Sequence, residues 1–194
     1  MSANDAGRWN ARYQQGWHSH EPKPREVLLR AAQLFQPASL VLDLAMGMGF
    51  NARWLIQNGF RVVGVDVSSV AVQSAKRQNQ DLMAFVGDLC EYQFPPAVFS
   101  AAINFYFLDR KVLGNLHRIL KPDGFAVIET LTTDMLEIRP ELPGDFLLHA
   151  GELRDLFSGW KVHYYFEGWR DSEHGGRKAI ASIIAQLPGD AAKC

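Results

Sequence analysis

Short apolar runs alternate with helix-like segments through the first two thirds of the chain. The runs comprise residues 41–44, 62–65, 82–86, 98–107 and 125–130. The run at 98–107 is almost continuously apolar, as expected for a strand buried on both faces of a parallel sheet. A helical pattern at 27–35 precedes the first run, and another at 109–120 ends at the Pro and Gly of 121–124. This alternation predicts an α/β protein with a parallel sheet.

The turn after the first run contains two glycines, Gly47 and Gly49. Glycine lets the backbone pass close to a ligand where a Cβ atom would collide with it. Seventeen residues after Gly49, the second apolar run ends in Asp66, whose carboxylate can accept hydrogen bonds from both hydroxyls of a ribose. A strand, a glycine turn, a helix and a strand that ends in an acid form a nucleotide-binding unit. We therefore expect an adenosine-containing cofactor.

Asp43 distinguishes between the two cofactors that fit this pattern. Residues 47–52 also match the G-x-G-x-x-G/A fingerprint of dinucleotide enzymes, in which the turn cradles a pyrophosphate at a helix N-terminus. Asp43, four residues before Gly47, would put negative charge near that pyrophosphate. The same carboxylate suits S-adenosylmethionine, which has positive sulfonium and ammonium groups and no phosphate. S-adenosylmethionine is the predicted cofactor, and an NAD(P)-dependent Rossmann oxidoreductase is the alternative.

Three segments resemble a known class of enzymes. The spacing Asp43-x-Ala45-x-Gly47-x-Gly49 resembles the first motif of the class I methyltransferases, and residues 119–125 resemble their L-K-P-G-G turn. Residues 146–160, with Gly-Glu-Leu-Arg and a later Gly-Trp, resemble the C-terminal part of the tellurite-resistance (TehB-type) methyltransferases. The resemblance covers roughly residues 9–186. Phe50 departs from it, since arginine is usual at that position.

The resemblance implies a particular fold. It is an α/β, Rossmann-like, doubly wound and mostly parallel sheet of seven strands. The last two strands, 160–167 and 177–186, would form an antiparallel hairpin, with the final strand inserted beside the fifth. We expect one methyltransferase domain over 1–194. Within it lie an N-terminal helical or lid segment at 1–37, a cofactor-binding core at 38–131, and a substrate-side loop with the C-terminal hairpin at 132–194.

The resemblance also implies residue roles. An acid after the third strand, here Asp88, would reach the adenine amino group, while the next backbone amide reaches a ring nitrogen. Asn104 and Phe105, at the end of the fourth strand, would meet the methionine part of the cofactor. The predicted cofactor-binding residues are Asp43, Ala45, Gly47, Gly49, Asn51, Asp66, Val67, Asp88, Leu89, Asn104 and Phe105. TehB-type proteins line the acceptor pocket with a His/Arg pair between the last two strands, which makes His174 and Arg177 the candidate catalytic residues.

The acceptor decides what further chemistry is needed. Methyl transfer requires alignment of nucleophile, methyl and sulfur, and a base only when the acceptor carries a neutral O–H, N–H or S–H group. We expect a small-molecule acceptor, with a thiol or a chalcogen oxyanion as candidates; a non-catalytic S-adenosylmethionine-binding protein is a second alternative. Trp9, Tyr13 and Trp17 recur every four residues, which places them on one helix face. That face either packs in the core or forms a dry wall beside the methyl group.

Composition limits the partners. The chain has 194 residues, 47% hydrophobic and 21% charged, with a net charge of −1. These values are typical of a globular protein. It contains no run of Lys or Arg, so we expect no nucleic-acid partner. No apolar segment reaches the length of a membrane span and no signal-peptide core is found, so we expect no membrane partner.

Cysteine and histidine spacing gives no metal pattern. Cys90 and Cys194 form neither a disulfide framework nor a ligand set, which is typical of reduced thiols in a cytoplasmic protein. His18, His20 and Glu21 could begin a metal site, but no further ligand stands at a fixed spacing. We therefore predict a cytoplasmic monomer or homodimer without a metal.

Overall fold

One sheet of seven strands runs through the protein, whose structure is a computed structural model that describes residues 3–16, 23–172 and 175–189. The strand order is β3-β2-β1-β4-β5-β7-β6. The five parallel strands are β1 (Leu40–Leu44), β2 (Arg61–Asp66), β3 (Met83–Val86), β4 (Phe99–Phe105) and β5 (Leu120–Leu131). β7 (Arg177–Gln186) lies antiparallel between β5 and β6 (Lys161–Asp171). The predicted fold class is confirmed, including the insertion of the last strand beside the fifth.

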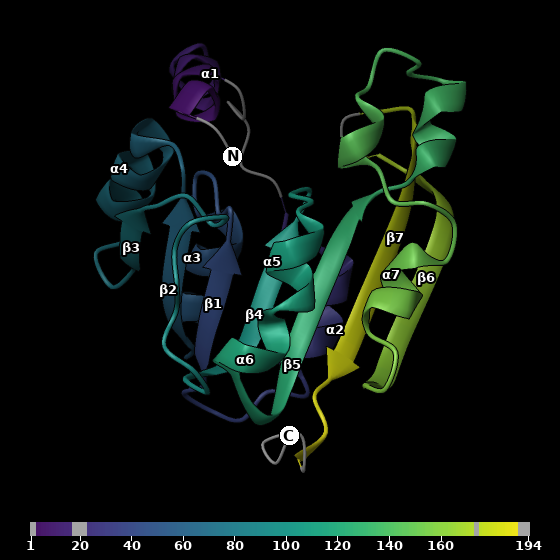
Figure 1. The fold of residues 1–194 in the computed structure, drawn as a ribbon. Helices are drawn as coiled ribbons and strands as arrows, with labels where there is room; N and C mark the ends of the chain where they lie inside the picture. Colours follow the sequence, from purple (N-terminus) through teal and green to yellow (C-terminus); the bar gives the residue numbers. More distant parts are fainter. Residues whose placement is uncertain (1–2, 17–22, 173–174, 190–194) are drawn as a thin grey trace.

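Helices cover both faces of this sheet (Figure 1). On one face lie α5 (Arg110–Gly114), α6 (Leu116–Ile119) and α7 (Glu152–Leu156), and on the other lie α2 (Glu26–Ala32), α3 (Phe50–Gln57) and α4 (Ser69–Gln78). Alternate residues of β1 supply the two cores: Leu42 and Leu44 pack with α5–α7, whereas Val41 packs with α2–α4. This is the period of two that a strand buried on both faces produces.

Two connections differ from the predicted elements. The helix predicted at 109–120 is divided at Asn115, where the backbone leaves the helical region between α5 and α6 (φ −92, ψ 1). The predicted stop at 121–124 belongs instead to β5, whose register against β4 shifts between Phe99 and Ala101. The register gives none of residues 121–124 a partner on β4, and Asp123 has a positive φ of 62°, so the predicted turn is kept as an irregularity within β5.

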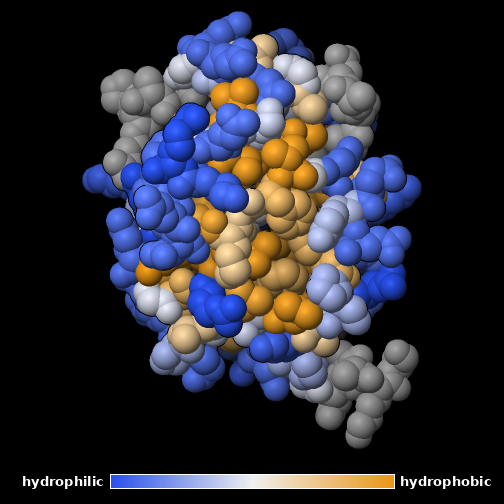
Figure 2. Space-filling view, turned by 90° about the vertical axis from the view of Figure 1, so that its left-hand side faces the viewer, coloured by the Kyte–Doolittle hydropathy of each residue, from blue (hydrophilic) through white to orange (hydrophobic). Residues whose placement is uncertain are grey.

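The chain between β5 and α7 forms two short 3-10 helices, η1 (Thr133–Glu137) and η2 (Gly144–Phe146). At the opposite edge of the sheet, β3 is the outermost strand and exposes Met83 and Val86. Figure 2 views the molecule from this side and shows hydrophobic residues gathered there. In the part of the chain that the structure describes, every helix is too short or too polar to traverse a lipid bilayer.

Helix α1 (Ala3–Gln14) lies above the carboxyl ends of β1 and β2 (Figure 1). The Oδ1 atom of Asn10 accepts hydrogen bonds from the Ser68 hydroxyl at 2.7 Å and from the Val70 backbone N–H at 3.2 Å. These contacts fasten α1 to the N-terminus of α4. As a result, one face of α1 covers the turn that contains the two glycines.

Candidate functional site

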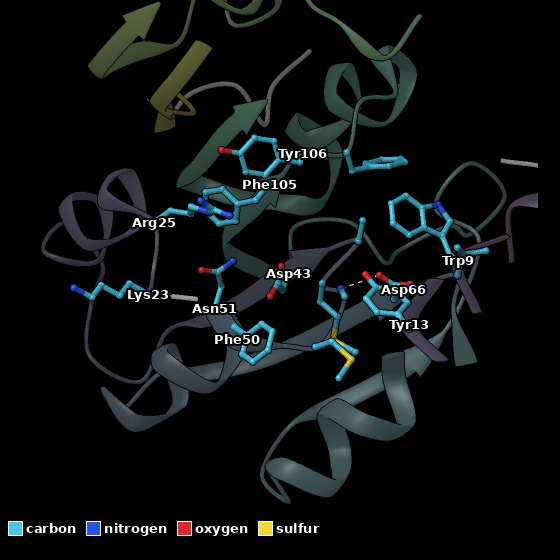
Figure 3. Close-up of a pocket in the computed structure, with 16 residues that line it drawn as sticks. Trp9, Tyr13, Lys23, Arg25, Asp43, Phe50, Asn51, Asp66, Phe105 and Tyr106 are labelled. Atoms are coloured by element: carbon cyan, nitrogen blue, oxygen red, sulfur yellow. Dashed lines mark hydrogen bonds between the residues drawn. The ribbon is translucent and has the colours of Figure 1, made fainter. Parts of the chain in front are cut away.

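A pocket of about 240 Å³ opens beyond the carboxyl ends of β1, β2 and β4 (Figure 3). Ligands of open α/β sheets bind at this edge, where neighbouring strands lead into loops on opposite sides. Seven of the predicted cofactor residues line the pocket: Asp43, Ala45, Gly47, Asn51, Asp66, Val67 and Phe105. Most of the residues predicted to bind the cofactor therefore line one cavity.

The glycine turn needs glycine for two separate reasons. Gly47 and Gly49 both have positive φ values, 55° and 73°, which other residues adopt only with strain. A Cβ atom on Gly47 would lie 2.7 Å from the Tyr13 hydroxyl, and one on Gly49 would lie 2.9 Å from the Cβ atom of Ala75. Gly47 thus allows Tyr13 of α1 to approach the turn closely, while Gly49 allows the start of α3 to pack closely on α4.

Asp66 connects the glycine turn to the end of β2. Its Oδ2 accepts a hydrogen bond from the Gly47 backbone N–H at 2.8 Å (Figure 3). Its Oδ1 accepts one from the Ser68 backbone N–H, also at 2.8 Å. Burial raises the pKa of this carboxyl, although the two N–H groups act in the opposite direction. The carboxylate predicted to hold a ribose therefore also holds the turn in place.

Asp43 lies on the floor of the pocket and is only 2% exposed. The backbone N–H of Ala52 contacts its carboxyl group, but Oδ2 has no hydrogen-bond partner among the described residues. Burial, together with the nearby charge of Asp66, raises the pKa of Asp43 from 3.8 to about 8. A buried acid with an unsatisfied oxygen carries a cost that a cationic ligand would remove. This site fits a positively charged cofactor.

The pocket has two chemically different ends (Figure 3). Asp66, Tyr13 and Trp9 lie at one end and Lys23 and Arg25 at the other, with Asp43 between them. The rings of Trp9 and Tyr13 are 5.9 Å apart, and burial, followed by the charge of Asp66, raises the pKa of Tyr13. Of the two interpretations of the aromatic stripe, a wall over the cavity fits these two residues. Trp17 lies outside the described residues.

Four other predicted cofactor residues do not line the pocket. Gly49, within the turn, faces Ala75 of α4, and Leu89 is buried in the core. Asp88 accepts a hydrogen bond from the Cys90 backbone N–H at 2.9 Å, within a tight turn. Asn104 is fully buried, and its Nδ2 donates to the Phe107 carbonyl at 2.7 Å, which shapes the loop after β4. Their contacts with a cofactor stay predictions.

The structure describes only one of the two candidate catalytic residues. His174 lies outside the described residues. Arg177 begins β7 and its guanidinium lies 5.2 Å from the centre of the Trp169 ring, and it does not line the pocket. Among the described residues, the cations that line the pocket are Lys23 and Arg25, which sequence reasoning missed. Their position within the predicted lid segment 1–37 was the available signal.

Tyr106, which also lines the pocket, was missed as well. It follows the last residue of β4, and its ring lies 4.8 Å from the Arg25 guanidinium. The Tyr106 hydroxyl donates to Oε1 of Glu129 at 2.9 Å and accepts from Nζ of Lys178 at 2.5 Å. Its place directly after a strand end, two residues from the polar Asn104, was a signal available in the sequence.

Residues 3–16, 23–172 and 175–189, which the structure describes, contain no set of metal ligands. No group of three or more His, Cys, Asp or Glu side chains there is arranged to hold an ion. His18, His20 and Glu21, considered above as the start of a metal site, lie outside these ranges.

Residues 41–124 match a family model described as a methyltransferase domain. A demethylmenaquinone methyltransferase of Beutenbergia cavernae is 32% identical over 104 residues, which are 50% of this chain and 43% of that enzyme. The chain therefore spans less than half the length of this curated relative.

Solved structures share nearly the whole fold. A SAM-dependent methyltransferase of Methanosarcina mazei has a TM-score of 0.71 at 17% identity, over 86% of this chain and 99% of that one. TehB from Haemophilus influenzae has a TM-score of 0.70 at 18% identity, over 92% of this chain and 67% of that one. At these identities the likeness establishes the fold alone.

Residues 41–124 thus match a methyltransferase-domain model, and the chain has the fold of the class I methyltransferases that use S-adenosylmethionine. This match and this fold agree with the predicted class of protein and with S-adenosylmethionine as its cofactor. TehB is among the proteins that share this fold, as the C-terminal resemblance implied.

Proposed function

We propose that this chain transfers a methyl group from S-adenosylmethionine to a small-molecule acceptor. The observation that supports this most is the buried carboxyl group of Asp43, whose Oδ2 has no partner among the described residues. The cofactor's positive charge would stabilise the ionised form of this carboxyl. A pyrophosphate at the same turn would instead disfavour the ionised form of this carboxyl and leave the cost of burying it in place, which disfavours the dinucleotide-dependent oxidoreductase.

Different residues along the pocket would contact different parts of the cofactor. Asp66, with both oxygens already accepting backbone N–H groups, has further lone pairs for ribose hydroxyls. Trp9 and Tyr13 cover this end and keep water from it. Asn51, at the start of α3, and Phe105, at the end of β4, border the centre. The bound cofactor supplies an electrophilic methyl group on sulfur, and the chain aligns the acceptor with it.

The acceptor belongs at the cationic end of the pocket. Lys23 and Arg25 can hold an anionic group there, which suits a small thiol that carries a carboxylate or a chalcogen oxyanion. Arg25 is braced by the ring of Tyr106. In this proposal Lys23 and Arg25 position the anionic group of the acceptor. The acceptor role of His174 and Arg177, the pair expected from the sequence, stays a prediction.

Release of S-adenosylhomocysteine tests the proposal. The acceptors are 3-mercaptopropionate, 1-propanethiol, selenite and tellurite, compared with RNA and a protein mixture, and calorimetry measures cofactor binding separately. We expect turnover with a small molecule, and faster turnover with 3-mercaptopropionate than with 1-propanethiol, which lacks the carboxylate. Methylation of RNA or protein alone would overturn the choice of acceptor. Cofactor binding without any turnover would favour the non-catalytic alternative.

A pair of double variants locates the anion site. Lys23→Met with Arg25→Met should raise the KM for 3-mercaptopropionate about 10-fold or more, since each charge-assisted hydrogen bond contributes about 1.5–3 kcal/mol. The matched control is Lys76→Met with Arg77→Met, which removes the same charge from the exposed last turn of α4. An equal effect of both variants would point to overall charge and not to a site. The monomer or homodimer state and the cytoplasmic location stay predictions.

A further inference from the structure

Tyr106 has a backbone conformation that its residue type disfavours. Its φ is 61°, in the left-handed region, immediately after β4 ends at Phe105. For a bulky aromatic residue this geometry costs about 1–3 kcal/mol, and such strain gathers at functional sites. The backbone N–H of Tyr106 donates to the Glu129 carbonyl at 2.9 Å, which holds the strained residue against β5. The strain directs a phenol to the wall of the cofactor pocket.

The Tyr106 hydroxyl belongs to a chain of polar groups that runs from the pocket into the sheet. It donates its proton to Oε1 of Glu129, a residue only 5% exposed, whose Oε2 accepts from the Ser182 hydroxyl at 2.9 Å. Lys178 Nζ donates to the phenol oxygen and lies 3.9 Å from Glu129 Oε1, so that the buried carboxylate has a compensating charge. The phenol proton of Tyr106 is therefore already directed at the buried carboxylate of Glu129.

We propose that Tyr106 is a catalytic residue that removes the proton of a protic acceptor, an inference that rests on the proposed methyl transfer. As the acceptor heteroatom bonds to the methyl carbon, the carbon–sulfur bond breaks and its electron pair stays on sulfur. The acceptor's proton passes to the Tyr106 oxygen while the phenol's own proton passes to Glu129. Tyr106 stays neutral throughout, and Glu129 becomes protonated.

Glu129 and Lys178 act through Tyr106 and are positioning residues in this scheme. Lys178 fixes the phenol oxygen, and Glu129 accepts the relayed proton in a place shielded from water. After the product leaves, the proton returns from Glu129 through the phenol to solvent in the pocket. The net reaction thus consumes the cofactor and the protic acceptor and yields thioether, methylated acceptor and one proton.

The test measures the rate at which Tyr106→Phe methylates 3-mercaptopropionate, at one pH below and one pH above the pKa of the thiol group. Below it, the thiol must lose a proton, and kcat should fall about 100-fold, the lower range for general base catalysis. Above it, the acceptor is already a thiolate, and the variant should reach the wild-type rate within a few fold. The Kd for S-adenosylmethionine and the KM for the thiol should change by less than a few fold at both pH values.

Two further variants separate catalysis from structure. Glu129→Gln keeps the side chain's shape but cannot take the proton, so it should show the same pH-dependent defect. Tyr164→Phe is the matched control, because the Tyr164 hydroxyl also accepts a hydrogen bond from a cation, Arg170 at 2.7 Å, but lies outside the pocket. It should keep the wild-type rate at both pH values.

The outcomes distinguish this inference from the proposed function. A wild-type protein that methylates only selenite or tellurite, or a Tyr106→Phe variant that is fully active below the thiol pKa, would overturn the inference alone. A defect of equal size at both pH values would assign Tyr106 a structural role and also overturn it. No turnover by the wild type with any acceptor would overturn the proposed function, and this inference with it.

Discussion

Replacement of Asp43 by asparagine should change how the stability of this protein depends on pH. The unfolded chain ionises this carboxyl near its ordinary pKa of 3.8, whereas burial and the charge of Asp66 raise the folded-state pKa to about 8. Between these values the folded protein binds a proton that the unfolded chain does not. The free energy of unfolding must therefore fall as the pH rises through this window.

The size of the effect follows from 1.36 kcal/mol for each unit of pKa difference. Between pH 5 and pH 8 the wild type should lose about 3–4 kcal/mol through this one group. The introduced asparagine side chain would keep the Ala52 contact and bury an unpaired NH₂ group, at a pH-independent cost of about 1–3 kcal/mol. Asp43→Asn should therefore match the wild type near pH 5 and exceed it by about 2–4 kcal/mol at pH 8.

Urea unfolding of the cofactor-free protein at several pH values measures this difference. Asp81→Asn, at an exposed position, is the control for the charge change and should follow the wild type at every pH. Parallel curves for the wild type and Asp43→Asn would refute the conclusion that Asp43 is protonated in the folded protein. The same reasoning predicts that S-adenosylmethionine binding releases up to about one proton near pH 7, since a cation favours the ionised carboxyl. Asp43→Asn should abolish that release in calorimetry.

Three further predictions concern the cofactor site and its surroundings. Asp66→Ala should weaken S-adenosylmethionine binding by about 1.5–3 kcal/mol. It should also lower the free energy of unfolding by about 1–3 kcal/mol, because two backbone N–H groups lose their acceptor. Unchanged affinity in calorimetry would remove Asp66 from the site. Gly49→Ala should cost more stability than Gly59→Ala in urea unfolding, because both glycines have positive φ but a Cβ at Gly49 would collide with α4, whereas one at Gly59 meets open space. Replacing His174 and Arg177 together should depress turnover and leave cofactor affinity within a few fold, and full activity of that double variant would remove the pair from the acceptor site.

Local features of the sequence determined the cofactor half of this protein. The period of two in the strands, the glycines at 47 and 49, and acids near the ends of two apolar runs predicted the sheet edge where Asp43 and Asp66 meet. These features are local because each strand must bury its side chains and each turn must allow a positive φ wherever the rest of the chain goes.

The tertiary structure alone decided the part of the pocket that we propose for the acceptor. Lys23 and Arg25 reach the pocket because the N-terminal segment passes over the strand ends, and the Tyr106 hydroxyl meets Glu129 and Lys178 across a gap of 23 and 72 residues. The second role of Asp66, as an acceptor for the Gly47 N–H, depends likewise on how β1 and β2 lie side by side. Contacts between residues so far apart leave no periodic trace in the sequence, because no local conformational preference requires them.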